Sequence, residues 1–132
     1  MSLEELTQLA ITNVHFRIFL SDLSNAISAP NDTGFYCYRA VETLLQEFKL
    51  PDESDNGRAW KRFRDALQVS QSWISPLTAA SKPNRHGEAK ALSGQERVHL
   101  MQRAWTLVHR FACLRSRGIQ ILPTTEFPPL ET

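Results

Sequence analysis

Residues 93–118 read SGQERVHLMQRAWTLVHRFACLRSRG and form the longest helical pattern in the chain. Ser93 and Glu96 have the spacing of a capping box, in which each side chain accepts a hydrogen bond from the other residue's backbone N–H. The pattern continues without a break to Ser116, and Gly118 is the residue type that most often follows the end of a helix. The sequence therefore predicts one long helix here.

Two adjacent apolar rows run along this predicted helix. One row consists of Val98, Met101, Trp105, Val108 and Ala112, and the other of Leu100, Ala104, Leu107, Phe111 and Leu114. So wide an apolar surface needs packing partners on two sides. We therefore expect the helix to lie either at the centre of a bundle or between the core and a dimer interface.

A second capping box, formed by Ser2 and Glu5, begins the first helical pattern of the chain. Apolar residues recur behind it at helical spacings, and Pro30 cannot continue a helix. One long first helix is therefore expected, ending near Ser28.

Three shorter helices are predicted between these two. Apolar spacing favours helices over residues 35–48 and 58–67, and a short helix that begins near Ser72 with Pro76 in its first turn. The chain thus predicts an all-α fold, an up-and-down bundle of four to five helices that forms a single domain over residues 1–118.

The last stretch of the chain, residues 119–132, has a different composition. It contains Pro123, Pro128 and Pro129, and so many prolines are incompatible with a helix. We expect an extended proline-rich tail that lies over the body of the protein or against a partner.

The composition favours one globular domain. The chain has 132 residues, of which 42% are apolar, which suffices for one core. Fifteen Lys and Arg residues stand against fourteen Asp and Glu, for a net charge of +1. This balance excludes a global attraction to nucleic acid or anionic lipid, so any such attraction must be local.

Several chemistries have no sequence signal here. Cys37 and Cys113 lie in apolar helical patterns without other ligands at metal spacing, so they are expected to be reduced core residues. No glycine-rich phosphate loop, nucleophile elbow or dinucleotide fingerprint occurs, so we expect neither a cofactor nor a metal. The N-terminus does not resemble a signal peptide and no run of about 18 apolar residues occurs, which favours a cytoplasmic protein without a membrane span.

A polar cluster at residues 84–88 is the strongest chemical signal. Arg85 offers a cation that can bind phosphate, and His86 offers a base that titrates near neutral pH. Asn84 and Lys82 beside them can contact RNA. The alternative interpretation is an ordinary exposed loop, which has similar composition.

Four residues of the second predicted helix can complete such a site. Arg39 and Glu42 lie three residues apart and so share one helical face, where they can join Arg85 and His86 as catalytic groups. Tyr36 and Tyr38 offer surfaces on which RNA bases can stack. The alternative for Arg39 and Glu42 is a structural ion-pair network that ties this helix to the Arg85 loop.

Three of these patterns, in this order, resemble a known family. They are residues 35–42 (FYCYRAVE), residues 60–67, and Arg85-His86-Gly87 ahead of the Ser93-capped helix that contains Ala104-Trp105. Together they look like the higher eukaryote and prokaryote nucleotide-binding (HEPN) family over roughly residues 9–115. The resemblance implies a bundle of four or five helices that commonly dimerises. Some members of the family are metal-independent RNases in toxin, phage-defence and RNA-processing systems, and others are not catalytic.

The chain departs from the catalytic motif of that family, in which an arginine precedes a histidine by four to six intervening residues. The residues at that distance before His86 are Ala79, Ala80 and Ser81, none of which is a cation. Lys82 is nearer, with three residues between, and lysine cannot contact a phosphate at two points as arginine does. Arg103 and His109 have the right spacing but sit inside the last predicted helix, where their directions differ by about 120°.

Two functions follow as hypotheses. The first is a homodimeric RNA-related protein, a metal-independent RNase or toxin-like subunit. The second is a non-catalytic interaction module that dimerises or docks a protein partner on the fifth predicted helix or the tail. In addition, Arg103, Arg110 and Arg117 recur every seven residues, with His99 one turn earlier, which predicts either a phosphate-binding stripe or a solvated helix face.

Overall fold

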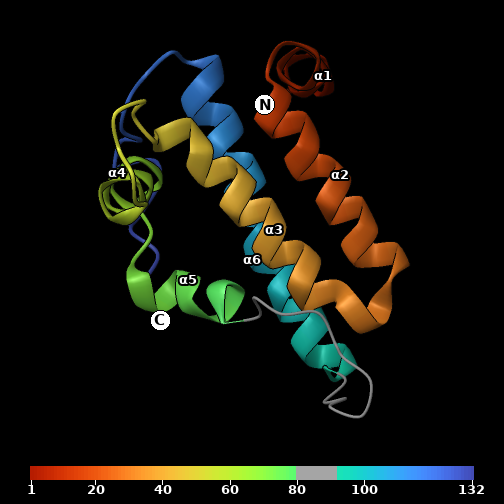
Figure 1. Ribbon diagram of the computed structural model, residues 1–132. Helices are drawn as coiled ribbons and strands as arrows, with labels where there is room; N and C mark the ends of the chain where they lie inside the picture. The colour runs from red at the N-terminus through yellow and green to blue at the C-terminus, as the bar shows by residue number, and fades with distance from the viewer. Residues whose placement is uncertain (80–91) are drawn as a thin grey trace.

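The computed structural model describes residues 1–79 and 92–132, and in these residues the protein is all-α (Figure 1). The all-α prediction is thus confirmed. The α-helices are α1 Leu3–Thr12, α2 Val14–Ser28, α3 Thr33–Leu45, α4 Gly57–Leu67, α5 Gln71–Thr78 and α6 Gly94–Ser116, with short 3-10 helices η1 Pro30–Asp32 and η2 Gln46–Phe48. The described residues therefore hold six α-helices where four to five were expected.

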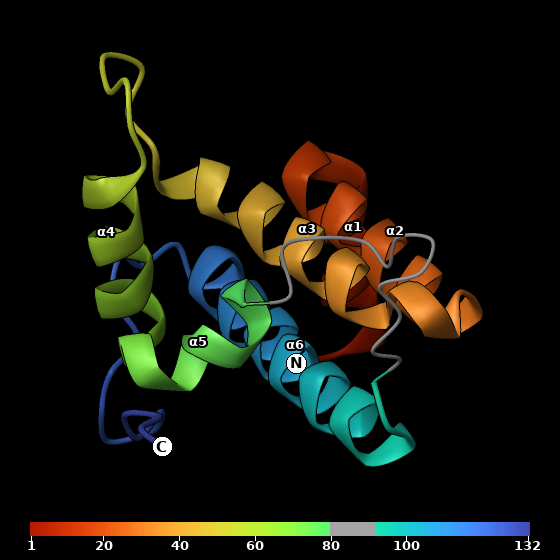
Figure 2. The same cartoon turned by 60° about the horizontal axis from the view of Figure 1, so that its bottom comes forward.

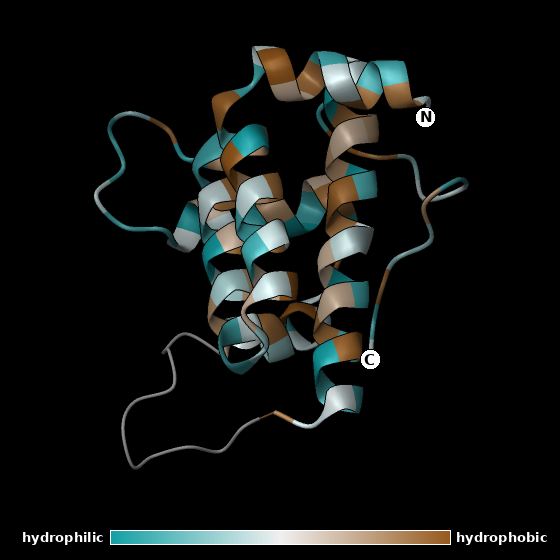
Figure 3. Ribbon diagram, turned by 90° about the vertical axis from the view of Figure 1, so that its right-hand side faces the viewer, coloured by the Kyte–Doolittle hydropathy of each residue, from teal (hydrophilic) through white to brown (hydrophobic). Residues whose placement is uncertain are grey.

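The additional helix arises at Asn13, which divides the expected first helix into α1 and α2. Asn13 is extended, and its N–H donates to the Leu9 carbonyl at 2.8 Å while its side-chain oxygen accepts from the Phe16 N–H at 2.9 Å. One residue thus ends α1 and caps α2. The prediction of a continuous helix to Ser28 was wrong, and α1 instead crosses one end of the molecule (Figure 3).

Helix α6 packs against all five other α-helices. The capping box is confirmed, since Ser93 Oγ accepts from the Glu96 N–H and Glu96 Oε1 accepts from the Ser93 N–H, both at 3.1 Å. Gly118 has a φ of +63°, the left-handed conformation expected after a helix end. Of the two apolar rows, the second is wholly buried, whereas the first is buried only toward its C-terminal end.

The core joins the helices through a chain of aromatic rings. Phe111 of α6 stacks on Phe16 of α2 with ring centroids 5.8 Å apart, and lies 6.3 Å from Phe48 of η2. Phe48 in turn meets Phe63 of α4 at 5.4 Å. Helices α2 and α3 lie side by side and make the broadest contact among the described helices, while α5 lies beside α6 (Figures 1 and 2).

Helix α5 begins earlier than expected. Ser70 caps it by accepting a hydrogen bond from the Trp73 N–H at 3.0 Å, so the helix starts at Gln71. Pro76 therefore lies inside the helix and not in its first turn, as had been predicted from a start near Ser72.

Residues 119–132 are not helical and pack on α4, α5 and α6. Leu122 and Phe127 are buried within the core, and the Leu122 N–H donates to the Ala66 carbonyl at 2.9 Å. Leu130 exchanges backbone hydrogen bonds with the turn between α4 and α5, so the end of the chain lies beside these helices (Figure 1). Buried side chains from the tail thus belong to the same core as the helices.

Both cysteines are free and buried, as predicted. Burial raises the pKa of the Cys37 thiol to about 11, so this thiol stays protonated at neutral pH. Within the described part of the chain, no helix combines the length and apolarity that a membrane span requires.

Candidate functional site

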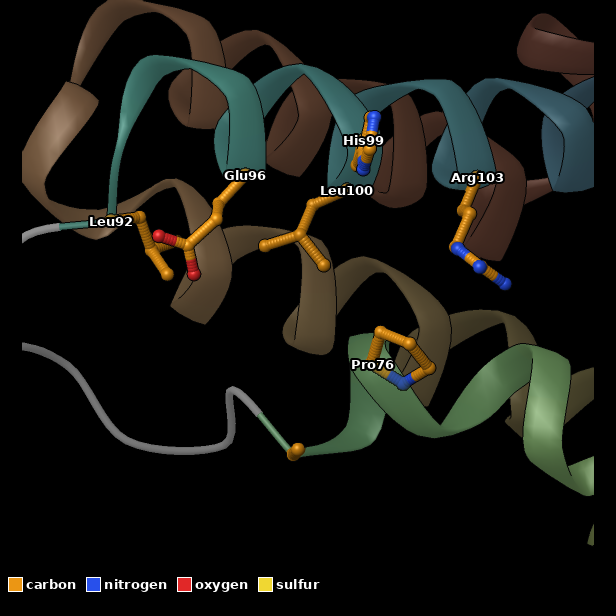
Figure 4. Close-up of a pocket in the computed structure, with 7 residues that line it drawn as sticks. Pro76, Leu92, Glu96, His99, Leu100 and Arg103 are labelled. Carbon is orange, nitrogen blue, oxygen red and sulfur yellow. The ribbon is translucent and has the colours of Figure 1, made fainter. Parts of the chain in front are cut away.

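A cavity of about 350 Å³ lies between α5 and α6 and gathers three polar side chains (Figure 4). Glu96, His99 and Arg103 are spaced three and four residues apart, so they form one row on α6. Apolar groups of Pro76 and Leu100 lie among them. The full lining is Pro76, Ala79, Leu92, Glu96, His99, Leu100 and Arg103.

Arg103 is held firmly at this cavity. Its Nη1 donates to the Trp73 carbonyl at 2.6 Å, and its guanidinium lies 5.1 Å from the centroid of the Trp73 ring. The same side chain lines an adjoining cavity of about 330 Å³, together with Trp73, Thr106 and Leu130. Because arginine has five N–H donors, several remain available to an anion.

His99 lines both cavities and is exposed. Within residues 1–79 and 92–132 its imidazole has no hydrogen-bond partner, so both ring nitrogens can meet a ligand. The Glu96 carboxylate accepts the Ser93 N–H and so takes part in capping α6. An imidazole base and a fixed cation therefore share the cavity with one carboxylate, and base and cation are two of the groups that metal-free phosphate chemistry uses.

The described chain is interrupted beside this cavity. Ala79 and Leu92, the two described residues that flank segment 80–91, both line it. The predicted residues Lys82, Asn84, Arg85 and His86 themselves lie outside the described residues.

Arg39 and Glu42 share a face of α3, as expected from their spacing, and line a cavity of about 270 Å³. That cavity has no lining residue in common with the α5–α6 cavity. The guanidinium of Arg39 lies 3.9 Å from the Asp22 carboxylate of α2 and 5.9 Å from the Tyr36 ring centroid. The ion pair of Arg39 in the described structure is therefore with Asp22 of α2, and not with a group of the predicted site.

Asp22 is a buried acid with an incomplete set of partners. Only 4% of the residue is exposed, and its Oδ2 atom has no hydrogen-bond partner in the described residues. Burial raises the pKa of the carboxyl, against the opposing effect of Arg39. An aspartate within an amphipathic helix is normally solvated, so the sequence held no signal for this burial.

The two tyrosines that were predicted to stack on RNA bases have different neighbours. Tyr36 packs edge-on against Phe35 with centroids 5.5 Å apart, near Arg39. Tyr38 faces Glu42, whose hydrogen bond raises the pKa of the phenol, and it lines a further cavity with Trp60. The described structure therefore does not bring the two rings to one site.

The predicted stripe of Arg103, Arg110 and Arg117 is not a continuous surface. Arg110 is buried, with 6% of the residue exposed, and Arg117 forms an ion pair with Glu126 of the tail. Only Arg103 lines the α5–α6 cavity. The three arginines together therefore form neither a solvated helix face nor a continuous phosphate-binding stripe, and both predictions for the stripe as a whole were wrong.

Fold and site together define an all-α protein with a small cavity on its longest helix, lined by one carboxylate, one imidazole and one guanidinium. Residues 3–116 match the family described as domain of unknown function (DUF8168) C-terminal domain, and the chain belongs to this family. Searches of curated proteins and of solved structures gave no match.

Proposed function

We propose that the chain binds RNA at the α5–α6 cavity and cleaves it without a metal ion. The observation that carries this proposal is the joint position of His99 and Arg103 on one wall of the cavity. A metal-free RNase needs a base for the ribose 2′-hydroxyl and a cation for the charge that develops at phosphorus. His99 takes the proton of the 2′-hydroxyl as that oxygen attacks phosphorus, and Arg103 stabilises the charge on the phosphoryl oxygens. The bond from phosphorus to the 5′-oxygen breaks, and the leaving oxygen takes a proton from solvent.

Two further points support this proposal. The segment that contains Arg85 and His86 enters and leaves the described chain at Ala79 and Leu92, on the rim of the same cavity. The side-by-side packing of α2 and α3, together with α6, is also compatible with the up-and-down bundle that the resemblance to HEPN proteins implies. A toxin-like or phage-defence role belongs to the same proposal.

Single-stranded RNA with a fluorescent label tests the proposal. Arg103→Gln keeps a donor for the Trp73 carbonyl but removes the charge, so RNA affinity should fall about tenfold. His99→Ala should lower the cleavage rate at least about 100-fold while binding changes little. Cleavage by the wild type should persist in the presence of a chelator.

Arg58→Gln is the matched control, because Arg58 is an exposed arginine of α4 outside these cavities. The proposal fails if Arg103→Gln binds RNA as well as Arg58→Gln does, or if purified wild type neither binds nor cleaves RNA. Thermal unfolding of each variant separates a local effect from loss of the fold.

A second candidate function, an interaction module, is favoured by the exposed part of α6. Val98 and Trp105 lie seven residues apart on one face and are 53% and 47% exposed. Exposed tryptophan side chains often anchor protein interfaces. We propose that this face joins two copies of the chain.

Trp105→Glu is therefore expected to convert a dimer into a monomer, since a charge in the centre of an apolar interface is costly. Light scattering after size-exclusion chromatography measures the mass. Leu50→Glu, at an exposed apolar residue outside α6, should leave the mass unchanged. A wild-type protein that is monomeric at high concentration would contradict the homodimer.

A further inference from the structure

A separate cavity of about 320 Å³ lies between α3, α4 and α5. It shares no lining residue with the α5–α6 cavity, so it is a distinct site on the other side of α5. Its volume falls within the range of small-molecule sites, about 300–1,000 Å³. The lining consists of Tyr38, Trp60, Arg64, Gln71, Ile74 and Thr78.

Two aromatic rings line this cavity and are held by their neighbours. Trp60 packs edge-on against Phe63, with ring centroids 5.4 Å apart at an angle of 73°. Tyr38 lies near the Glu42 carboxylate, which raises the pKa of its phenol. Both rings are half-buried, so each keeps an exposed part that a planar ligand can contact.

Arg64 differs from the neighbouring cations of α4. Lys61 pairs with Asp65 at 3.0 Å, and Arg62 pairs with Glu53 and donates to the Phe48 carbonyl. The guanidinium of Arg64 has no hydrogen-bond or ion-pair partner across residues 1–79 and 92–132. A half-buried arginine that lines an aromatic cavity without an acid is suited to an anionic ligand.

We propose that this cavity binds a purine nucleotide, with the base against Trp60 and Tyr38 and the phosphate on Arg64. Aromatic side chains bind bases by stacking, and the Gln71 amide offers the paired donor and acceptor that recognise an adenine edge. The natural ligand is an unpaired adenine nucleotide of RNA, a point that rests on the proposed RNA function. The cavity and its chemistry do not depend on that function.

Isothermal titration with adenosine 5′-monophosphate tests the site directly. Wild type should bind the nucleotide, and Arg64→Gln should weaken binding about tenfold through loss of the charged contact. Lys61→Gln, a change of the same charge on the same helix outside the cavity, should leave affinity unchanged. Gln71→Ala should reduce the preference for adenosine over uridine monophosphate, since Gln71 is exposed and not needed for packing.

The inference is overturned if wild type does not bind adenosine monophosphate, or if Arg64→Gln and Lys61→Gln bind it equally. Its failure is distinguishable from failure of the proposed function. RNA cleavage that depends on His99, without mononucleotide binding, would remove this inference alone. Mononucleotide binding that depends on Arg64, in a protein that neither binds nor cleaves RNA, would remove the proposed function and leave the nucleotide site.

Discussion

Replacing Arg110 with alanine should lower the free energy of unfolding by about 3 kcal/mol. Arg110 Nη1 donates to the carbonyls of Leu67 and Gln68 at 2.9 and 3.2 Å, and Nη2 donates to the Pro128 carbonyl at 2.9 Å. The guanidinium also lies 5.6 Å from the centroid of Phe127. One buried side chain therefore joins α6 to the end of α4 and to the tail, and its loss leaves three carbonyls without this donor.

Chemical denaturation of the variant and the wild type measures this difference. Arg110→Lys should recover only part of the loss, because one ammonium group cannot reproduce the planar fork. Arg17→Ala, the same change at an exposed position of α2, should alter stability by less than about 0.5 kcal/mol. If Arg110→Ala and Arg17→Ala have equal stabilities, the hydrogen bonds of Arg110 make no net contribution to the free energy of unfolding.

Local chemistry explains which parts of the fold were predictable. The start and end of α6 were correct because a capping box and a left-handed glycine act within a few residues. The break at Asn13 also has a local cause, but helical apolar spacing continues across it and concealed the cap. Where one residue both ends and begins a helix, periodicity alone gives the wrong length.

Non-local packing explains what could not be predicted. Arg103 and Arg110 occupy equivalent positions of a seven-residue repeat, yet one lines a cavity and the other is buried. The difference arises because the tail folds back over Arg110, a contact between residues far apart in the chain. A spacing of four residues places His99 and Arg103 on one stripe of α6, but their cavity exists only because α5 lies beside α6.

Glu47 also makes contacts between distant parts of the chain, and its removal should strongly lower the stability of the fold. Its carboxylate accepts hydrogen bonds from Asn13 Nδ2 at 2.7 Å and His15 Nδ1 at 2.5 Å, and lies 3.4 Å from Arg115 Nε. These partners come from the junction of α1 and α2 and from the end of α6. Glu47→Ala removes the acceptor common to all three, and should lower the free energy of unfolding by about 2–3 kcal/mol at neutral pH.

The effect of Glu47 should depend on pH in a definite direction. Burial alone would raise the pKa of this carboxyl, but the hydrogen bonds from His15 and Asn13, with the charge of Arg115, outweigh burial and lower it. A lowered pKa means that the folded state favours the ionised form. The stabilisation is therefore complete above the ordinary glutamate pKa of about 4.3 and is lost as the pH falls through the lower, folded-state value.

Denaturation curves of the wild type and Glu47→Gln, taken from neutral pH down to about pH 3, isolate this contribution. The stability difference between the two should be fully present above the ordinary glutamate pKa of about 4.3 and should shrink as Glu47 is protonated in the wild type. Glu131→Gln, at an exposed carboxylate, should follow the wild-type curve throughout. A Glu47→Gln deficit that stays constant over this range would show that the packing of the side chain, and not its charge, holds the α1–α2 junction to the end of α6.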